Sequence, residues 1–254
     1  MGNKLKIGVF KFTSCSGCQM QFIYNQDRIM ETIGAFDVVY FKMGKRDNLE
    51  GPFDVSLVEG GITSPEDIIK LKSIREKSRI LVAFGACAVD TGLLSIKNWI
   101  PEKVVEEKVY ANTSVIHSIK AQPIDEFVKV NFYLKGCPVD EDEMLELFSA
   151  ALLDRKPYLR PHAVCVECKL KENVCLLVAS KEPCMGPVTN AGCGAVCVSN
   201  KKACFGCRGP MNDPNPEALA ELFRENGLSP DDIKRKFTEF ASVTKAFSKG
   251  AEAA

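Results

Sequence analysis

The sequence contains few histidines and no excess of charge of either sign. Of its 254 residues, two are histidines, 33 are Lys or Arg and 33 are Asp or Glu, so the formal net charge is zero. A chain without net charge is not expected to bind nucleic acid or an anionic membrane surface. Two histidines are too few for a histidine-based acid–base or metal site. No Ser–His–Asp set or nucleophile elbow is present, which argues against a stand-alone hydrolase.

Long apolar runs are also missing. No run of about 18 or more apolar residues occurs, so we expect no membrane span. The first residues, MGNKLKIGVFKF, pass straight into a strand-like run without a signal peptide's apolar stretch and small-residue cleavage site. We therefore expect a cytoplasmic chain, with export in complex with a signal-bearing partner as the alternative.

Cysteine, by contrast, is abundant. The twelve cysteines could form disulfides, but the cytosol keeps thiols reduced, and a chain of this length can build a hydrophobic core without them. Three pairs have the C-x2-C spacing of metal ligands. These pairs are Cys15/Cys18, Cys165/Cys168 and Cys204/Cys207. The cysteine pattern therefore predicts metal binding.

Strand and helix patterns alternate up to about residue 155. Continuous apolar runs, which are typical of strands buried on both faces, occur repeatedly in this part. They span residues 5–12, 36–43, 53–60, 79–86 and 130–137. Ser64, followed by Pro65, and Asp140 each precede a helical pattern as capping residues do. The alternation predicts an α/β fold with a doubly wound parallel sheet.

The chain changes character after about Pro157. Residues 161–210 contain eight of the twelve cysteines, many glycines and prolines, and no sustained periodicity. A metal core can replace the missing hydrophobic core in such a segment. Residues 216–227 and 229–243 then have the pattern of two capped helices, the first of which ends at Gly227. We expect a cysteine-rich domain with little regular structure, followed by C-terminal helices.

The first four cysteines follow strands of the predicted sheet. Cys15 and Cys18 come after the first strand, Cys87 after the fourth and Cys137 after the fifth. The carboxyl ends of parallel strands meet at one edge, where open α/β sheets bind ligands. These thiols should therefore converge on one site. Four thiolates without a histidine suit either tetrahedral zinc or a 4Fe–4S cluster.

Glycines stand beside these cysteines. Gly17, Gly85 and Gly136 would let the backbone approach closely and direct N–H groups at sulfur. Such hydrogen bonds stabilise a reduced cluster and raise its potential. The alternative is that these residues are ordinary turn glycines. The first loop, TSCSGCQ, is not the glycine-rich phosphate grip of a dinucleotide or flavin site, so we expect no nucleotide on this chain.

The motifs around the cysteines resemble those of small subunits of NiFe hydrogenases. They are TSCSGCQMQ, VEGGI, FGACA and GCP, after the first, third, fourth and fifth strands. The later stretch, CVECKLKENVC…EPCMGPVTNAGCGAVC…ACFGCRGP, is similar to the small (delta) subunit of cytosolic NAD(P)-linked hydrogenases, or sulfhydrogenases, of archaea and bacteria. This resemblance covers nearly the whole chain. It implies a flavodoxin-like domain over residues 1–158 and an iron–sulfur domain over residues 159–254.

The resemblance also implies which cysteines bind which cluster. It gives the proximal cluster Cys15, Cys18, Cys87 and Cys137. It gives the medial cluster Cys193, Cys197, Cys204 and Cys207, and leaves Cys165, Cys168, Cys175 and Cys184 for the distal cluster. An exchange of Cys184 and Cys207 between the last two clusters is the alternative, as in two-cluster ferredoxins. A second alternative is that the segment with the last eight cysteines binds zinc.

Two departures from the better-known periplasmic enzymes bear on cluster type. Those enzymes have a histidine distal ligand where this chain has Cys165, and His162 lies three residues away. They have a proline where Cys197 stands, which makes their medial cluster 3Fe–4S. The resemblance therefore implies three 4Fe–4S clusters here. Such a relay should work at lower potential, which suits a reversible nicotinamide partner.

Glu59 and the two histidines are the remaining candidates. Glu59 ends the third strand at the ligand edge. The resemblance implies a glutamate beside the proximal cluster that tunes it or carries protons, but not a ligand. The alternative is an exposed loop carboxylate. We expect His117 at the surface, and His162 at most hydrogen-bonded to the distal cluster.

The function implied by the resemblance is electron transfer. Hydrogen would be split at a NiFe centre in a separate large subunit, and this chain would pass electrons to flavin/iron–sulfur subunits that reduce NAD(P). The chain alone should have no hydrogenase activity. The alternatives are the small subunit of a heterodisulfide-reductase-linked or electron-bifurcating NiFe complex, a quinone-linked complex subunit, and a zinc-stabilised scaffold.

Overall fold

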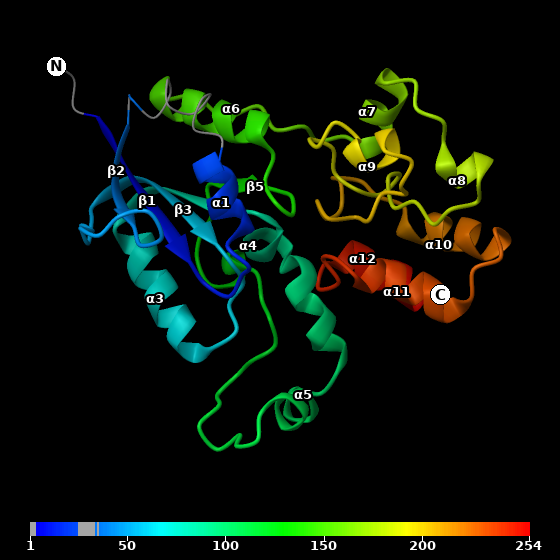
Figure 1. The fold of residues 1–254 in the computed structure, drawn as a ribbon, viewed down its shortest axis with the longest axis horizontal. Helices are drawn as coiled ribbons and strands as arrows, with labels where there is room; N and C mark the ends of the chain where they lie inside the picture. The colour runs from blue at the N-terminus through cyan, green and yellow to red at the C-terminus, as the bar shows by residue number, and fades with distance from the viewer. Residues whose placement is uncertain (1–3, 25–33, 35) are drawn as a thin grey trace.

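The protein is described by a computed structural model, which covers residues 4–24, 34 and 36–254. Two parts follow each other along the chain (Figure 1). The first is built on a sheet, and the second contains short helices and loops, with helical segments between residues 164 and 252.

All five strands of the sheet are parallel, in the order β2-β1-β3-β4-β5. Their bounds are β1 Leu5–Lys11, β2 Phe36–Phe41, β3 Phe53–Glu59, β4 Ser78–Phe84 and β5 Phe132–Leu134. This order is that of flavodoxin-like folds, in which the strand order reverses between β1 and β3. The predicted doubly wound sheet is therefore confirmed. The last predicted strand was too long, because only three of its residues pair.

Asn131 explains the short β5. Its backbone N–H donates to the carbonyl oxygen of Leu81, and its side-chain Oδ1 accepts from the N–H of Leu81 at 2.8 Å. The amide side chain takes the place of a backbone partner, so regular pairing starts one residue later.

Helices cover both faces of the sheet (Figure 1). One face packs against α1 (Gly17–Tyr24) and α6 (Glu141–Leu152), and the other packs against α3 (Pro65–Glu76). The two predicted caps are confirmed. Ser64 Oγ accepts from the N–H of Asp67, and the Asp140 carboxylate accepts from the N–H groups of Asp142 and Glu143.

The segment between β4 and β5 leaves the sheet and returns. It contains α4 (Ala86–Asp90), the 3-10 helices η1 (Gly92–Trp99) and η2 (Ile124–Glu126), and α5 (Glu102–Val109). In Figure 1, α5 and the loop after it extend away from the rest of the molecule. Apolar side chains on this segment are exposed, among them Val109 and Tyr110.

The second part has its own apolar core. The short helices α7 (Val164–Leu170), α8 (Leu176–Ala179) and α9 (Val196–Ser199) precede α10 (Pro216–Glu225), α11 (Pro230–Thr238) and α12 (Lys245–Glu252). Phe223, Phe237 and Phe247 from the last three helices are completely buried in that core, and several cysteines pack against it. The prediction of two helices was wrong beyond Thr238, because the second helix ends there and α12 follows.

Gly250 explains why α12 packs so closely. A Cβ atom at this position would lie 2.4 Å from a ring carbon of Phe237 in α11. The small residues near the C-terminus therefore serve helix–helix contact. No helix in the described part of the chain has the length and apolar character needed to cross a bilayer.

Candidate functional site

The first four cysteines lie at the carboxyl edge of the sheet, beside the switch point between β1 and β3. Cys15 and Cys18 follow β1, Cys87 lies in the first turn of α4 after β4, and Cys137 follows β5. After burial, the charges of Cys137 and Cys15 raise the pKa of Cys87, and that of Cys15 raises the pKa of Cys137. Cys87 and Cys137 act in the same way on Cys18. The predicted convergence of these thiols on one edge is thus seen in the structure.

Burial and mutual repulsion make these thiols hard to ionise. Burial raises the pKa of Cys87 to about 12, with further contributions from Cys137 and Cys15. Burial, followed by the charge of Glu59, raises the pKa of Cys18 well above its usual value. Such a group of thiols becomes a group of thiolates only when a bound cation compensates their charge. The donor set therefore fits a metal-containing cofactor.

Glu59 is part of this site and not an exposed loop residue. It ends β3 and is only 1% exposed. Its Oε1 atom accepts from the N–H of Cys18 at 3.2 Å, while Oε2 has no hydrogen-bond partner in the described structure. Burial raises the pKa of this carboxyl group. The alternative of an exposed carboxylate was therefore wrong.

The glycines beside the cysteines have different roles. The N–H of Gly17 donates to Cys15 Sγ at 3.3 Å, as predicted. The N–H of Gly85 instead donates to the carbonyl oxygen of Leu134, so the prediction of a sulfur contact from this N–H was wrong. A Cβ atom at Gly85 would lie 2.2 Å from Cys18 Sγ, and its φ of +90° suits glycine. Gly85 therefore makes room for the Cys18 sulfur.

A second set of cysteines lies in the second part of the chain. Cys165 and Cys168 are on α7, Cys175 caps α8, and Cys184 lies in the following loop. All four line one small apolar cavity. Burial raises the pKa of Cys165 to about 11, followed by the charges of Cys184, Cys168 and Cys175.

A third set lies between the first two and consists of the predicted Cys193, Cys197, Cys204 and Cys207. Burial raises the pKa of Cys207 to about 11, and the charges of Cys193, Cys137 and Cys197 add to the effect. Cys204 is almost completely buried and interacts with Cys207 and Cys184. Cys184 lies with Cys165, Cys168 and Cys175, but it also interacts with Cys197 and Cys204. The partition of these eight cysteines between two clusters stays a prediction.

Hydrogen bonds connect neighbouring sets. The N–H of Cys204 donates to Cys184 Sγ at 3.3 Å, which joins the third set to the second. The backbone N–H of Cys137 points at the sulfur of Cys207, which joins the first set to the third. The three sets are therefore linked in the order first, third, second.

The two remaining predicted residues are histidines. His117 is exposed, as expected. Nδ1 of His162 lies 3.2 Å from the carbonyl oxygen of Ala163. Trp99 is 42% exposed and has the ammonium group of Lys234 over its ring at 5.3 Å.

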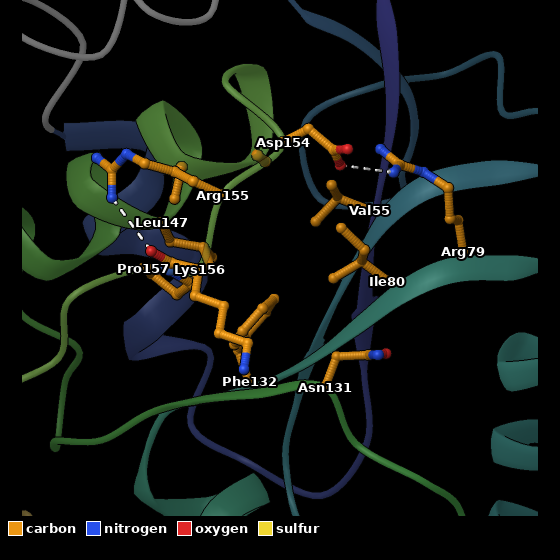
Figure 2. A pocket seen from close by; sticks show the side chains of 12 residues that line it. Val55, Arg79, Ile80, Asn131, Phe132, Leu147, Asp154, Arg155, Lys156 and Pro157 are labelled. Carbon is orange, nitrogen blue, oxygen red and sulfur yellow. Dashed lines mark hydrogen bonds and ion pairs between the residues drawn. The ribbon is translucent and has the colours of Figure 1, made fainter.

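A separate cavity of about 280 Å³ opens at the opposite, amino-terminal edge of the sheet (Figure 2). It has an apolar floor that includes Val55 and Ile80. Around it, Arg79 pairs with Asp154, and Arg155 donates to the carbonyl oxygen of Lys156 (Figure 2). No cysteine lines this cavity, so it is distinct from the thiol sites.

The chain matches the model of the family described as NADH ubiquinone oxidoreductase, 20 kDa subunit, over residues 15–151. This match covers most of the sheet and the first four cysteines. The eight cysteines of the second part lie beyond it.

Individual relatives match over a longer range. The chain is 32% identical to the delta subunit of sulfhydrogenase 2 of Pyrococcus furiosus, over 93% of this chain and 99% of that protein. It is 30% identical to a subunit of the F420-non-reducing hydrogenase of Methanocaldococcus jannaschii, over 81% of this chain and 82% of that protein. Among solved structures, a chain of an NAD+-reducing NiFe hydrogenase in the H2-reduced state is similar, with a TM-score of 0.55 and 26% identity. That match covers 62% of this chain and 96% of the other.

The role of Gly85 can be tested by Gly85→Ala. The added methyl group would collide with Cys18 Sγ and displace it. It would also strain the backbone by about 1–3 kcal/mol, because the φ of +90° and ψ of 162° at this position suit glycine almost exclusively. We expect faster alkylation of Cys18 by iodoacetamide, measured by mass spectrometry of the native protein.

Gly227→Ala is the matched control, because Gly227 has a φ of +93° and nothing within 4 Å of an added Cβ. It should carry the backbone strain without changing the alkylation of Cys18. Equal alkylation of Cys18 in the two variants would contradict a specific role for Gly85.

Proposed function

Because the chain belongs to the NADH ubiquinone oxidoreductase 20 kDa subunit family, we propose that it is the electron-transfer small subunit of a cytosolic NiFe hydrogenase. It would hold three 4Fe–4S clusters. These would connect the NiFe site of a large subunit with a flavin/iron–sulfur partner that reduces NAD(P). The full-length similarity to a sulfhydrogenase delta subunit supports the hydrogenase assignment.

The observation that carries this proposal is the linked arrangement of three groups of four cysteines. All twelve thiols are free of disulfides. The first group lies at the ligand edge of the sheet, and contacts between cysteines lead from it to the third group and then to the second. This sequence of contacts matches a proximal, medial and distal order. The proposed ligand sets are Cys15, Cys18, Cys87 and Cys137; Cys193, Cys197, Cys204 and Cys207; and Cys165, Cys168, Cys175 and Cys184.

The spacing of the thiols favours clusters over zinc. Tetrahedral zinc brings four sulfurs to about 2.3 Å from one ion, whereas each cysteine of a cubane binds a different iron. Among the described residues, no three His, Cys, Asp or Glu side chains are grouped closely enough to hold a single metal ion. Clustered but separated thiols are what a larger cofactor requires.

The surrounding backbone supplies what a cluster needs. When bound, a cluster of this type accepts and releases one electron at a time. N–H groups directed at cysteine sulfur, such as those of Gly17, Cys204 and Gly186, stabilise the additional negative charge of the reduced state. The chain itself contributes ligation, spacing and hydrogen bonds, and we expect no hydrogenase activity from it alone.

Two further parts of the proposal concern organisation and location. We assign residues 1–158 to the flavodoxin-like domain with the proximal cluster, and residues 159–254 to the domain with the medial and distal clusters. The boundary falls between α6, which ends at Leu152, and α7, which starts at Val164. Twelve free thiols suit the reducing cytoplasm.

A NiFe complex with a different electron acceptor is the second candidate. The similarity to a subunit of an F420-non-reducing hydrogenase supports this alternative. A quinone-linked subunit is less well supported. That group usually has adjacent cysteines in its first motif and a single cluster, whereas this chain has Cys15-x2-Cys18 and eight further cysteines.

Purification of the complex through a tag on this chain separates these candidates. We expect mass spectrometry to identify a NiFe large subunit together with flavin- and iron–sulfur-containing subunits that reduce NAD(P), because the relay needs a donor and an acceptor. Capture of a heterodisulfide reductase would establish the second candidate. Capture of quinone-linked membrane subunits without a NiFe subunit would refute both.

The proposed medial ligand set is tested by Cys197→Pro. Loss of one ligand should remove one iron from the medial cluster and give a 3Fe–4S cluster, since the remaining cysteines still hold three irons. In the oxidised complex this change should add the EPR signal of a three-iron cluster. Val196→Ala, at the neighbouring exposed position, is the control and should leave the spectrum unchanged. An unchanged spectrum in Cys197→Pro would remove Cys197 from the ligand set.

A further inference from the structure

Arg208 is the largest side chain buried completely in the described structure. It directly follows Cys207 and is only 2% exposed. A guanidinium group without compensation would be costly at such a site. Its partner is Glu143 of α6, whose carboxylate lies 2.5 Å from Nη2 and is 4% exposed. An ion pair thus joins the sheet domain to the cysteine-rich part, between residues 65 positions apart.

The remaining N–H groups of Arg208 bind two backbone segments that carry cysteines. Nη1 donates to the carbonyl oxygen of Lys135 at 2.9 Å, and Nε donates to the carbonyl oxygen of Ala191 at 2.7 Å. Each carbonyl belongs to the residue two positions before a cysteine, namely Cys137 and Cys193. The guanidinium therefore holds a segment of the proximal set and a segment of the medial set at the same time.

A glycine separates the bound carbonyl from the cysteine in both segments. A Cβ atom at Gly136 would lie 3.1 Å from Nη1, and one at Gly192 would lie 2.2 Å from Nη2. Both glycines have positive φ, +122° and +120°. The two segments thus share one pattern, in which a carbonyl accepts from Arg208 and a glycine allows the guanidinium to lie against the backbone.

The contact between the two sets lies directly beside this ion pair. The N–H of Cys137 points at the sulfur of Cys207, the residue that precedes Arg208. Arg208 therefore follows one partner of this N–H···S contact, Cys207, and binds a carbonyl oxygen two residues before the other, Cys137.

We propose that Arg208 is a positioning residue, which holds the proximal and medial ligand segments at a fixed separation and stabilises negative charge on the reduced clusters. This inference rests on the proposed function, because it assumes that Cys137, Cys193 and Cys207 bind clusters. In the step concerned, one electron would pass from a proximal cluster held by Cys137 to a medial cluster held by Cys193 and Cys207, with no bond formed or broken. The Glu143 carboxylate opposes the charge of Arg208, so the two residues set the local potential in opposite directions.

Redox titration of the purified complex, followed by EPR, tests this proposal. Arg208→Gln removes a positive charge and should lower the midpoint potential of the medial cluster. Glu143→Gln leaves the backbone contacts of Arg208 in place and should raise that potential. The double variant, Arg208→Gln with Glu143→Gln, should return towards the wild-type value. Opposite shifts of this kind would not follow from a purely structural role.

Arg208→Lys separates charge from geometry. Lysine keeps the positive charge but cannot bind both carbonyl groups and Glu143 in the same planar arrangement. We expect a potential close to wild type, a weaker magnetic interaction between the reduced proximal and medial clusters, and a loss of about 10- to 100-fold in hydrogen-dependent turnover, as for other residues that orient metal ligands.

The control is Arg224→Gln, which removes an exposed arginine paired with Glu221 on α10. It should leave the potential and the magnetic interaction unchanged. The proposal is overturned if Glu143→Gln does not raise the midpoint potential of the medial cluster. This test holds whether or not the Arg208→Gln variant assembles. It is also overturned if Arg208→Lys keeps the wild-type interaction and turnover. Failure of the proposed function is recognised separately, because wild-type chain dissociated from the complex would then show no iron–sulfur signals.

Discussion

The electrostatic cost of placing many cysteine sulfurs in a protein interior is the constraint on which the structure depends. Cys18, Cys184 and Cys204 are buried, and the thiols of each group oppose one another's ionisation. Neutral thiols could be buried singly at little cost, but groups of thiolates require cationic compensation. Backbone N–H groups directed at sulfur reduce the remaining cost. The loops and short helices of the second part are consistent with this requirement, since they bring ligands together with little regular structure.

Polar contacts near the cysteines also join the sheet part of the molecule to the cysteine-rich part. Cys137, at the edge of the sheet, contacts Cys207 of the second part through its N–H group. Arg208 and Glu143 form a buried ion pair at this junction, and Lys135 Nζ donates to the carbonyl oxygen of Pro210 at 2.7 Å. Further hydrogen bonds join the Ser95 region to Ser242. The parts are therefore held together by directional polar contacts beside the cysteines, which suits a chain that must keep redox sites at constant separation.

Much of the sheet and of the first site could be predicted because both follow from local patterns. The buried apolar runs indicate parallel strands, and their carboxyl ends necessarily share an edge, which brings Cys15, Cys18, Cys87 and Cys137 together. The helix starts at Ser64 and Asp140 depend on adjacent residues and were equally visible. The pairing of Arg208 with Glu143 was not predictable in this way, because neither residue has a local pattern that indicates a partner so distant in the chain. Helix α12 was missed for a related reason, since Gly250 is unfavourable for a helix in isolation and is explained only by its contact with Phe237.

The content of iron, sulfide and zinc in the anaerobically purified complex tests the central claim most directly. The twelve cysteines are proposed to bind three cubane clusters, so this chain should account for about twelve irons and as many sulfides, beyond those of its partners. Wild-type chain dissociated from the complex should be brown and should bleach with dithionite. A colourless chain with about three zinc ions and no iron would contradict the account.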